Sequence, residues 1–471
     1  MTKLTALAAV FAERECDTNA LVTDMLRAMS HRGSDAVMVE CNNRRSGVGY
    51  SSHNLPGGFV RSKFSTVAWD GVFFKRNLRG QTRLAAYESA HNFRSIMTIP
   101  GAFAEISCEP NKLTAVRDPV GLRPLYYSST NGVTAIASER KALWRIGRTQ
   151  VERVCPGYLY IVKSHGATRR RLFRFHSPRP QRMTMQYAAA RLKWLLQRSI
   201  RSATSDLDRV AVAFSGGLDS AITALLAKQA NLNVELISTG LRDSPELQTA
   251  EKFAKALDLP ISIQVYDADS LGHFIRRIIW LIEEHSLMKV SIAIPLHWAA
   301  LLAARRGFSV MLCGQGSDEL YGGYYKYAKI LDNEGRKALL SALHQSIVEA
   351  PQVNYERDEQ ATCPTGVEIR TPFANLEVID FSFRIPLEFK VRSGNDLMRK
   401  WVLRAAALKA GLPEEMAWKR KKAIQHGTGV ERAIQRFASN QKLAPHEYLA
   451  RISMEVTKLA EMPSLSATDN R

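Results

Sequence analysis

Two serines, two glycines and an aspartate stand together at residues 215–220, which read Ser-Gly-Gly-Leu-Asp-Ser. Glycines allow a backbone to come close to an anion, and the free N–H groups at a helix start point toward it. Asp219 stands where a carboxylate would hold a Mg²⁺ ion that bridges phosphate oxygens. No Gly-Lys-Ser/Thr closes the loop, so it is not a Walker A sequence. These residue types and their spacing predict a phosphate-binding loop of another kind.

The elements that must position this loop are a strand and a helix. Residues 210–214 form a short apolar run rich in β-branched side chains, which is typical of a buried parallel strand. Residues 218–229 have helical spacing, with apolar side chains on one face. Ser-Gly-Gly alone would indicate an ordinary turn. In a strand–turn–helix context the six residues resemble the pyrophosphatase loop of the ATP-pyrophosphatases, which cut ATP between its α and β phosphates to adenylate a substrate.

A second cluster follows another predicted strand. Residues 313–323 read Cys-Gly-Gln-Gly-Ser-Asp-Glu-Leu-Tyr-Gly-Gly, directly after the apolar run 309–312. Open parallel sheets bind their ligands at the carboxyl ends of the strands, so both loops are expected at one edge. Asp318 is then a second Mg²⁺ ligand opposite Asp219. The sequence predicts ATP and Mg²⁺ as cofactors.

The chain divides by pattern into parts. Residues 1–165 alternate short strand-like runs with turns and have one periodic helix at 19–29, which indicates a sheet-rich domain. Residues 166–182 are basic, contain two prolines and predict a linker. Residues 183–460 begin with strands and helices in alternation, typical of a doubly wound parallel sheet, and continue with helices. Residues 461–471 form a polar tail.

The predicted elements are short. The strands of the first domain are expected at 4–11, 47–50, 66–74, 102–107, 113–117, 125–127, 134–137 and 158–162. In the second domain, strands are expected at 234–238, 261–266 and 309–312, and helices at 244–257, 271–284 and 296–306.

Composition excludes several classes of protein. Hydrophobic residues make up 45% of the 471, enough for packed cores, and no run approaches the ~20 apolar residues of a membrane span. The six cysteines are scattered, which indicates a reducing cytoplasm without disulfides or zinc. The net charge of +20 admits a polyanion partner. Because the cations come in short pieces without interleaved aromatics, we favour a solvated basic surface, and we expect neither a nucleic-acid nor a membrane partner.

Further motifs extend the resemblance to a family. Residues 366–373 read Gly-Val-Glu-Ile-Arg-Thr-Pro-Phe, and residues 418–422 read Trp-Lys-Arg-Lys-Lys. Near the N-terminus stand His-Arg-Gly-Ser-Asp at 31–35 and Arg-Asp-Pro-Val-Gly-Leu-Arg-Pro-Leu-Tyr-Tyr at 117–127. In order and spacing, this ensemble resembles the asparagine synthetase family. The resemblance implies an N-terminal Ntn-type αββα sandwich, followed by a doubly wound parallel-sheet ATP-pyrophosphatase domain with a helical C-terminal part.

The first domain departs from the family where glutamine would be hydrolysed. The family begins with a processed cysteine whose thiolate attacks glutamine. Here Thr5 takes that position, with four residues before it. The arginine that holds the glutamine carboxylate is met by Ser52 or a neighbour, and the glutamate of Asn-Gly-Glu by Val72. The resemblance then implies a domain without glutaminase activity that serves as a structural partner, as in the β-lactam synthetases.

The second domain keeps the family's site more completely. The resemblance implies these ATP-binding residues: Ala213, Ser215, Gly216, Gly217, Leu218, Asp219, Ser220, Thr239, Cys313 and Gly314. Lys421 matches the family lysine that neutralises charge on departing pyrophosphate and on the tetrahedral intermediate. Gln315 replaces the usual glutamate and cannot take a proton. Glu368 is the alternative base for the attacking amine, unless it simply pairs with Arg370.

These features predict an ATP-dependent amide-bond-forming ligase. A carboxylate, aspartate or an analogue, attacks ATP with release of pyrophosphate, and ammonia or an amine then attacks the acyl-adenylate. One alternative is a lactam or peptide cyclase of a biosynthetic pathway, and another is a nucleotide-binding homologue without turnover. The expected partners are small molecules in the cytoplasm, and a homodimer is left open.

Overall fold

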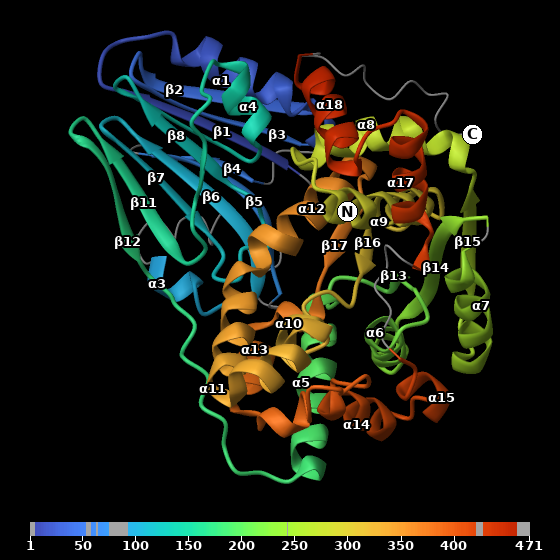
Figure 1. The fold of residues 1–471 in the computed structure, drawn as a ribbon. Coiled ribbons are helices and arrows are strands. Elements are labelled where there is room, and N and C mark those ends of the chain that lie inside the picture. The colour runs from blue at the N-terminus through green and yellow to red at the C-terminus, as the bar shows by residue number, and fades with distance from the viewer. Residues whose placement is uncertain are drawn as a thin grey trace.

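The computed structural model describes residues 5–52, 58–62, 65–74, 93–242, 244–420 and 427–458. Two antiparallel sheets stack on each other in the N-terminal part, and a parallel sheet with helices on both faces follows (Figure 1). This arrangement confirms the predicted fold class of a two-sheet domain in front of a doubly wound domain.

The two N-terminal sheets have six strands each. One has the order β10-β8-β9-β1-β3-β2 and the other β12-β11-β7-β6-β5-β4. The strands are β1 Thr5–Ala12, β2 Ala36–Asn43, β3 Ser46–Ser52, β4 Phe59–Arg61, β5 Thr66–Phe73, β6 Gly101–Glu109, β7 Lys112–Arg117, β8 Tyr126–Thr130, β9 Val133–Ala137, β10 Glu152–Arg153, β11 Tyr158–Lys163 and β12 Gly166–Arg171.

Strand β1 is buried on both faces, which explains its unbroken apolar run. Leu7 and Ala9 join the core between the two sheets. Ala6, Ala8 and Val10 instead pack toward α1 (Thr18–Ala28) and α4 (Arg140–Arg145), which cover the outer face of the first sheet. A strand with two covered faces has no polar side to show, so its sequence cannot alternate.

The predicted linker begins in a strand. Residues 166–171 form β12, which pairs antiparallel with β11 at the edge of the second sheet. The connection between the two parts of the chain is therefore residues 172–184, and α5 (Met185–Ala203) follows it.

The second domain is built on a five-stranded sheet of order β15-β14-β13-β16-β17, in which every pairing is parallel. Its strands are β13 Arg209–Ala213, β14 Asn233–Leu241, β15 Ile261–Tyr266, β16 Val310–Leu312 and β17 Glu368–Arg370. The first four confirm the predicted strands. Strand β17 was not predicted, because three residues show no period.

Helices cover both faces of this sheet. The connecting helices are α6 Leu218–Lys228, α7 Pro245–Leu257, α8 Leu271–Ile282 and α9 Leu287–Arg305. Helix α9 is longer than predicted, since it begins nine residues before 296. Among the described residues it is the one helix whose length and apolar composition would suffice for a membrane span. Inside the fold it packs against α8, against α12 (Glu356–Thr362) and against the sheet, which accounts for that composition.

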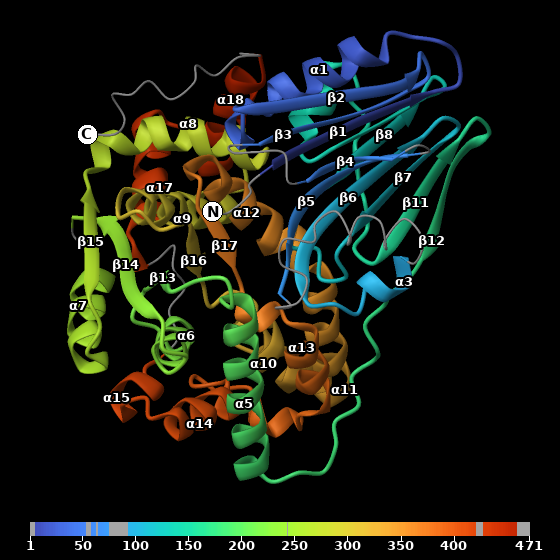
Figure 2. The ribbon, with the colours of Figure 1, turned by 180° about the vertical axis from the view of Figure 1, so that it is seen from behind.

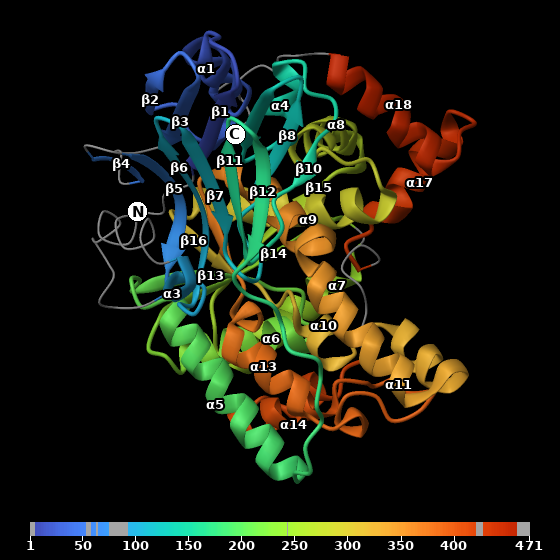
Figure 3. The same ribbon diagram turned by 90° about the vertical axis from the view of Figure 1, so that its left-hand side faces the viewer.

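The remaining chain is helical. A short 3₁₀ or π turn joins several helices, the π-helical one being Pro351–Tyr355. The helices are α3 Phe93–Ile96 in the first domain, then α10 Ser317–Tyr321, α11 Tyr325–Ala350, α12 Glu356–Thr362, α13 Leu376–Arg384, α14 Trp401–Ala410, α15 Glu414–Ala417, α17 Val430–Asn440 and α18 Pro445–Lys458. Figures 2 and 3 show α17 and α18 beside α8 and α9, away from α5 and α14.

Candidate active site

The two predicted loops meet at the carboxyl edge of the parallel sheet. One loop leads from β13 into α6 and the other from β16 into α10. Gly314 brings them together, because a Cβ there would stand 2.7 Å from the Cβ of Asp219. Gly216 has a φ of +63°, a backbone conformation that glycine adopts without strain. The expected placement of both loops at one edge is what the structure has.

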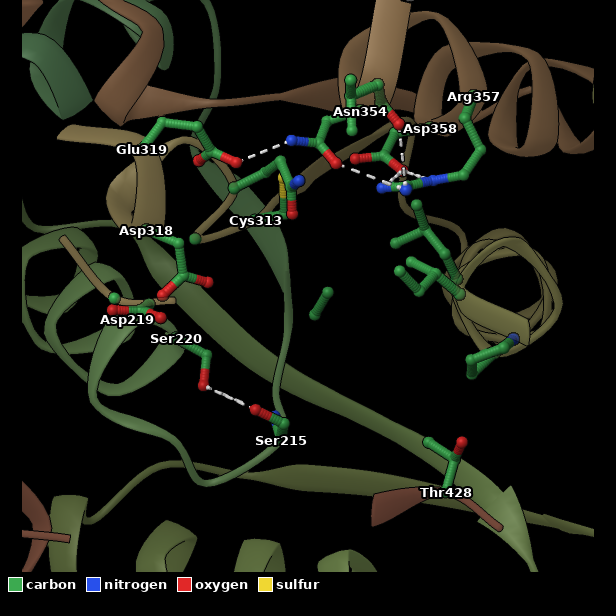
Figure 4. A pocket seen from close by; sticks show the side chains of 18 of the residues that line it. Ser215, Asp219, Ser220, Cys313, Asp318, Glu319, Asn354, Arg357, Asp358 and Thr428 are labelled. Carbon is green, nitrogen blue, oxygen red and sulfur yellow. Dashed lines mark hydrogen bonds and ion pairs between the residues drawn. The ribbon is translucent and has the colours of Figure 1, made fainter. Parts of the chain in front are cut away.

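A cavity of about 600 Å³ opens between these loops (Figure 4). One end is apolar and suited to a purine ring, with walls from Ile237, Met288, Ile292, Leu296 and Ala299. Of the residues predicted to bind ATP or metal, the cavity is lined by Ala213, Ser215, Asp219, Ser220, Thr239, Cys313, Gly314 and Asp318. Gly217 and Leu218 line a smaller cavity of about 90 Å³, which shares Ser215, Asp219 and Ser220 with the main one.

Two buried side chains on the wall of the main cavity, Thr239 and Cys313, are not reactive groups. Thr239 donates its hydroxyl hydrogen to the Pro295 carbonyl oxygen at 3.0 Å. Burial raises the pKa of the Cys313 thiol to about 12, so this cysteine is no nucleophile. Both residues therefore shape the cavity without supplying a reactive group.

The smaller cavity is lined by more cations than carboxylates. Its cationic lining residues are Lys400, Arg404, Lys419 and Arg420. The Lys419 ammonium donates to the Gly216 carbonyl oxygen at 3.1 Å, which places that cation directly on the phosphate loop. Cations beside a glycine loop at a helix start form a site for a polyphosphate.

Lys400 joins the two aspartates. Its Nζ lies 2.7 Å from Oδ1 of Asp219, 2.6 Å from Oδ1 of Asp318 and 2.8 Å from the Ser317 hydroxyl. The lysine side chain is only 2% exposed. Two carboxylates that both reach one ammonium also fit a divalent cation between them. Sequence reasoning missed Lys400, because no recognised motif surrounds it and it stands at the start of α14, far along the chain from either loop.

The polar end of the cavity contains a second group that the sequence did not reveal. Glu319 accepts hydrogen bonds from the Asn354 amide at 2.7 Å and from the Tyr324 hydroxyl at 2.5 Å. Burial, and then the neighbouring Asp318 charge, raise the pKa of Glu319. Asn354 comes from the turn before α12 and lies beside Arg357 in Figure 4.

Arg357 and Asp358 complete this end. Arg357 donates from Nε to Oδ1 of Asp358 at 2.8 Å. Burial raises the pKa of Asp358, although the guanidinium opposes that shift. Glu319 could have been suspected from the acidic loop that holds Asp318. Residues 354–358 gave no signal, because only the tertiary fold brings them to the cavity.

The three predicted catalytic residues lie in different places. Gln315 lines the main cavity. Glu368 does not line it: its carboxylate accepts from Arg123 at 2.8 Å and from Arg370 at 2.9 Å, and its side chain is 3% exposed. Strand β17 places Glu368 opposite Val310, at the start of the parallel strands, whereas the cavity opens beyond their ends. Lys421 lies outside the described residues, after Lys419 and Arg420.

The residues that the resemblance places at the glutaminase site lie in the two N-terminal sheets. Thr5 begins β1, opposite Ser52 of β3, and its side-chain oxygen is buried with no hydrogen-bond partner among the described residues. Its carbonyl oxygen accepts from Nε of Arg32 at 2.9 Å. Asp70 of β5 is fully buried, and its carboxylate lies 3.7 Å from the Arg32 guanidinium. Val72 continues the same strand.

A phosphate loop and a cationic cavity at the edge of a parallel sheet, behind a two-sheet domain, define a two-domain nucleotide-dependent enzyme. Comparison with protein families places it further. The asparagine synthase profile matches residues 191–362 and 332–451, and the glutamine amidotransferase domain profile matches residues 66–145. The chain therefore belongs to the asparagine synthase family, and it is an ATP-dependent carbon–nitrogen ligase.

Curated relatives agree with this assignment. A putative glutamine-hydrolysing asparagine synthetase of Methanocaldococcus jannaschii is 29% identical over 72% of this chain and 70% of its own length. Asparagine synthetase B of Escherichia coli is 29% identical over 70% of this chain and 61% of its own. The asparagine synthetase of Gallus gallus is 22% identical over 89% and 83%.

One solved structure with a slight likeness to this chain is a purine-biosynthesis enzyme. The glutamine phosphoribosylpyrophosphate amidotransferase of B. subtilis matches at a TM-score of 0.33 and 15% identity, covering 55% of this chain and 65% of that chain.

Proposed function

We propose that this ligase adenylates a substrate carboxylate at the α-phosphate of ATP and then joins the acyl group to an amine or to ammonia. The observation that carries the proposal is one continuous site: an apolar end, a glycine loop, two aspartates and a set of cations around Asp219. An acid that attacks the α-phosphate expels pyrophosphate, and cations beside the loop stabilise the charge that leaves.

The residues of the site divide this work by position. The apolar end near Thr239 and Leu296 accepts the adenine ring. Loop N–H groups after Ser215 and the start of α6 bind phosphate oxygens. Asp219 and Asp318 would hold Mg²⁺, which would supply further neutralisation of the phosphates when bound. Lys400 stands between these carboxylates and keeps them at one place.

Lys421 stays our candidate for the cation that meets the transition state. Its predecessors Lys419 and Arg420 line the cationic cavity, which supports this choice. Charge that develops as pyrophosphate leaves, and later as the tetrahedral oxyanion forms, is the charge an oriented lysine stabilises.

Neither Gln315 nor the predicted base Glu368 is suited to take the amine proton. The Gln315 amide accepts no proton at neutral pH. Both oxygens of Glu368 are committed to buried guanidinium groups away from the cavity. We therefore assign Gln315 to the cavity wall and Glu368 to the join between the domains.

Glutamine is not the nitrogen donor in this proposal. A threonine would need a free α-amino group as its base, whereas Thr5 is preceded by four residues and lies in a buried strand. Ser52 and Val72 offer no counterpart to an arginine and a glutamate that would bind glutamine. Free ammonia, or an amine on the substrate itself, is the remaining donor. The second case makes the enzyme a lactam or peptide cyclase.

ATP–pyrophosphate exchange across a panel of carboxylic acids tests these proposals. Exchange with aspartate supports asparagine synthesis, and exchange only with an amine-bearing acid supports the cyclase. Absence of exchange with every acid would contradict adenylation and favour a binding protein without turnover. Asp219→Asn is the internal control, because it should abolish exchange while leaving the circular dichroism spectrum unchanged. Glutamate release from glutamine, at a rate close to that of amide formation, would refute the assignment of the N-terminal domain.

A further inference from the structure

Two faces of helix α12 have different contacts: one lines the main cavity, and the other meets the N-terminal domain. Together with Asn354 of the preceding turn, Arg357 and Asp358 line the main cavity. Glu356 and Glu359 are three residues apart, so they share another face of the helix. Each of these two glutamates is 2% exposed. A buried carboxylate needs partners, and here every partner comes from the N-terminal domain or its edge.

Glu356 is held by three donors. Arg117 at the end of β7 donates from Nη1 at 3.1 Å, and Arg153 of β10 from Nε at 2.8 Å. The Tyr126 hydroxyl of β8 donates at 2.9 Å to Oε2, the oxygen that also accepts from Arg153, whereas Arg117 donates to Oε1. Burial alone would raise the pKa of Glu356, but the charges of Arg117 and Arg153 lower it instead. The carboxylate is thus charged and fully committed to the other domain.

Glu359 is held by two arginines of the same domain. Arg32 donates from Nη1 at 3.1 Å and makes a second, shorter bond from Nη2. Nη1 of Arg123 lies 3.6 Å from Oε1 of Glu359. Both arginines lie in the N-terminal segments that resemble the family's glutaminase domain. Their cations are directed here at a helix of the ligase domain, which Figure 1 shows between the N-terminal sheets and α9.

We propose that the N-terminal domain positions the polar end of the ligase cavity through this double attachment of α12. Any shift of the helix would leave a buried carboxylate or guanidinium unpaired, which is costly, so the helix is held in one place. The restraint reaches the cavity directly, because Asn354 bonds Glu319 and Arg357 bonds Asn354. Tyr126 and Arg153 are then positioning residues for the acid or amine, and they are remote from the phosphate loop. The effect on catalysis rests on the proposed function, whereas the attachment does not.

Tyr126→Phe tests the attachment, because it removes one bond to Glu356 and keeps the ring. Tyr127→Phe is the matched control: its hydroxyl donates to Glu152 at 2.8 Å, within the N-terminal domain and at its surface. In hydrogen–deuterium exchange, we expect Tyr126→Phe to speed exchange roughly tenfold for the amides of residues 352–362, as expected for one lost bond to a charged group. The control should leave those amides unchanged. Unchanged exchange at 352–362 in Tyr126→Phe, and in the double variant with Arg153→Met, would overturn the proposal.

Kinetics of the intact enzyme separate positioning from general stability. With an acid that supports ATP–pyrophosphate exchange, Tyr126→Phe should raise KM for that acid about five- to tenfold and leave KM for ATP unchanged. Equal changes in both constants, or in neither, would show that the attachment serves stability alone. If no acid supports ATP–pyrophosphate exchange, the proposed function fails. Hydrogen–deuterium exchange at the amides of residues 352–362 still decides whether the attachment exists.

Discussion

Removal of the Lys400 charge gives the sharpest test of the site. In Lys400→Met the aliphatic side chain stays, but Asp219 and Asp318 lose the ammonium that lies within 2.7 Å of each. Breaking a buried ion pair from one side costs about 3–5 kcal/mol, because the remaining charge is left uncompensated. The two aspartate side chains are 14% and 15% exposed, so water relieves part of this cost, and we expect the lower bound of about 3 kcal/mol.

The assay has a stability arm and an activity arm. Without nucleotide, Lys400→Met should have a lower melting temperature than the unmodified enzyme. Mg²⁺ with ATP should reduce this difference in melting temperature, because a cation then returns to the two carboxylates. ATP–pyrophosphate exchange should fall roughly a hundredfold or more, the size expected for losing one oriented charge.

Lys228→Met is the control for this experiment. Its ammonium pairs with Asp258 at 3.0 Å, but the two side chains are 39% and 98% exposed. Such a surface pair contributes less than about 1 kcal/mol to stability. Neither the melting temperature nor the rate of ATP–pyrophosphate exchange should therefore change appreciably. A Lys400→Met enzyme that unfolds like Lys228→Met and exchanges at the unmodified rate would refute the assigned role of Lys400.

Three further outcomes follow from named contacts. Lys421→Ala should lower turnover roughly a hundredfold with little change in ATP binding, measured by steady-state kinetics and titration; unchanged turnover would move the role to Lys422. Glu368→Gln should lower the melting temperature and slow exchange and amide release together, because it weakens the buried pairs with Arg123 and Arg370; a selective loss of amide release would restore Glu368 as a base. Burial lowers the pKa of His297 to about 3, so the folded state binds fewer protons than the unfolded one below pH 6.5. Stability should therefore fall as the pH drops from about 6.5 toward 3, and His297→Gln should flatten that part of the urea-unfolding profile against pH.

Local patterns were sufficient to predict the loops and the sheet that carries them. The loop at 215–220, the strand before it and the helix after it are encoded by adjacent residues, so their spacing alone revealed them. The sequence also predicted that both loops would meet, because parallel strands present their carboxyl ends at one edge. The same reasoning missed β17 and the first half of α9. A three-residue strand has no period, and a helix that is apolar on all sides has no stripe.

Charged residues were harder to assign, because a side chain's partners are set by the fold. Glu368 stands in a motif and was an acceptable candidate base, but its carboxylate meets Arg123, 245 residues away, inside the join between the domains. Nothing near Glu368 in the chain indicates that partner. The alternative considered from the sequence, a pair with Arg370, is one of the two contacts that the structure has.

The sequence by itself determined the family, the order of the domains and the phosphate loop, since each depends on residues that are neighbours along the chain. Through the family resemblance, it also predicts that Thr5 stands where a cysteine would act. Only the tertiary structure decided which cation faces the two aspartates, because Lys400 and Asp219 are 181 residues apart. It likewise decided that the glutamates of α12 belong to the N-terminal domain. Burial makes an ion pair strong or costly, and burial is a property of the packed chain that no local pattern contains.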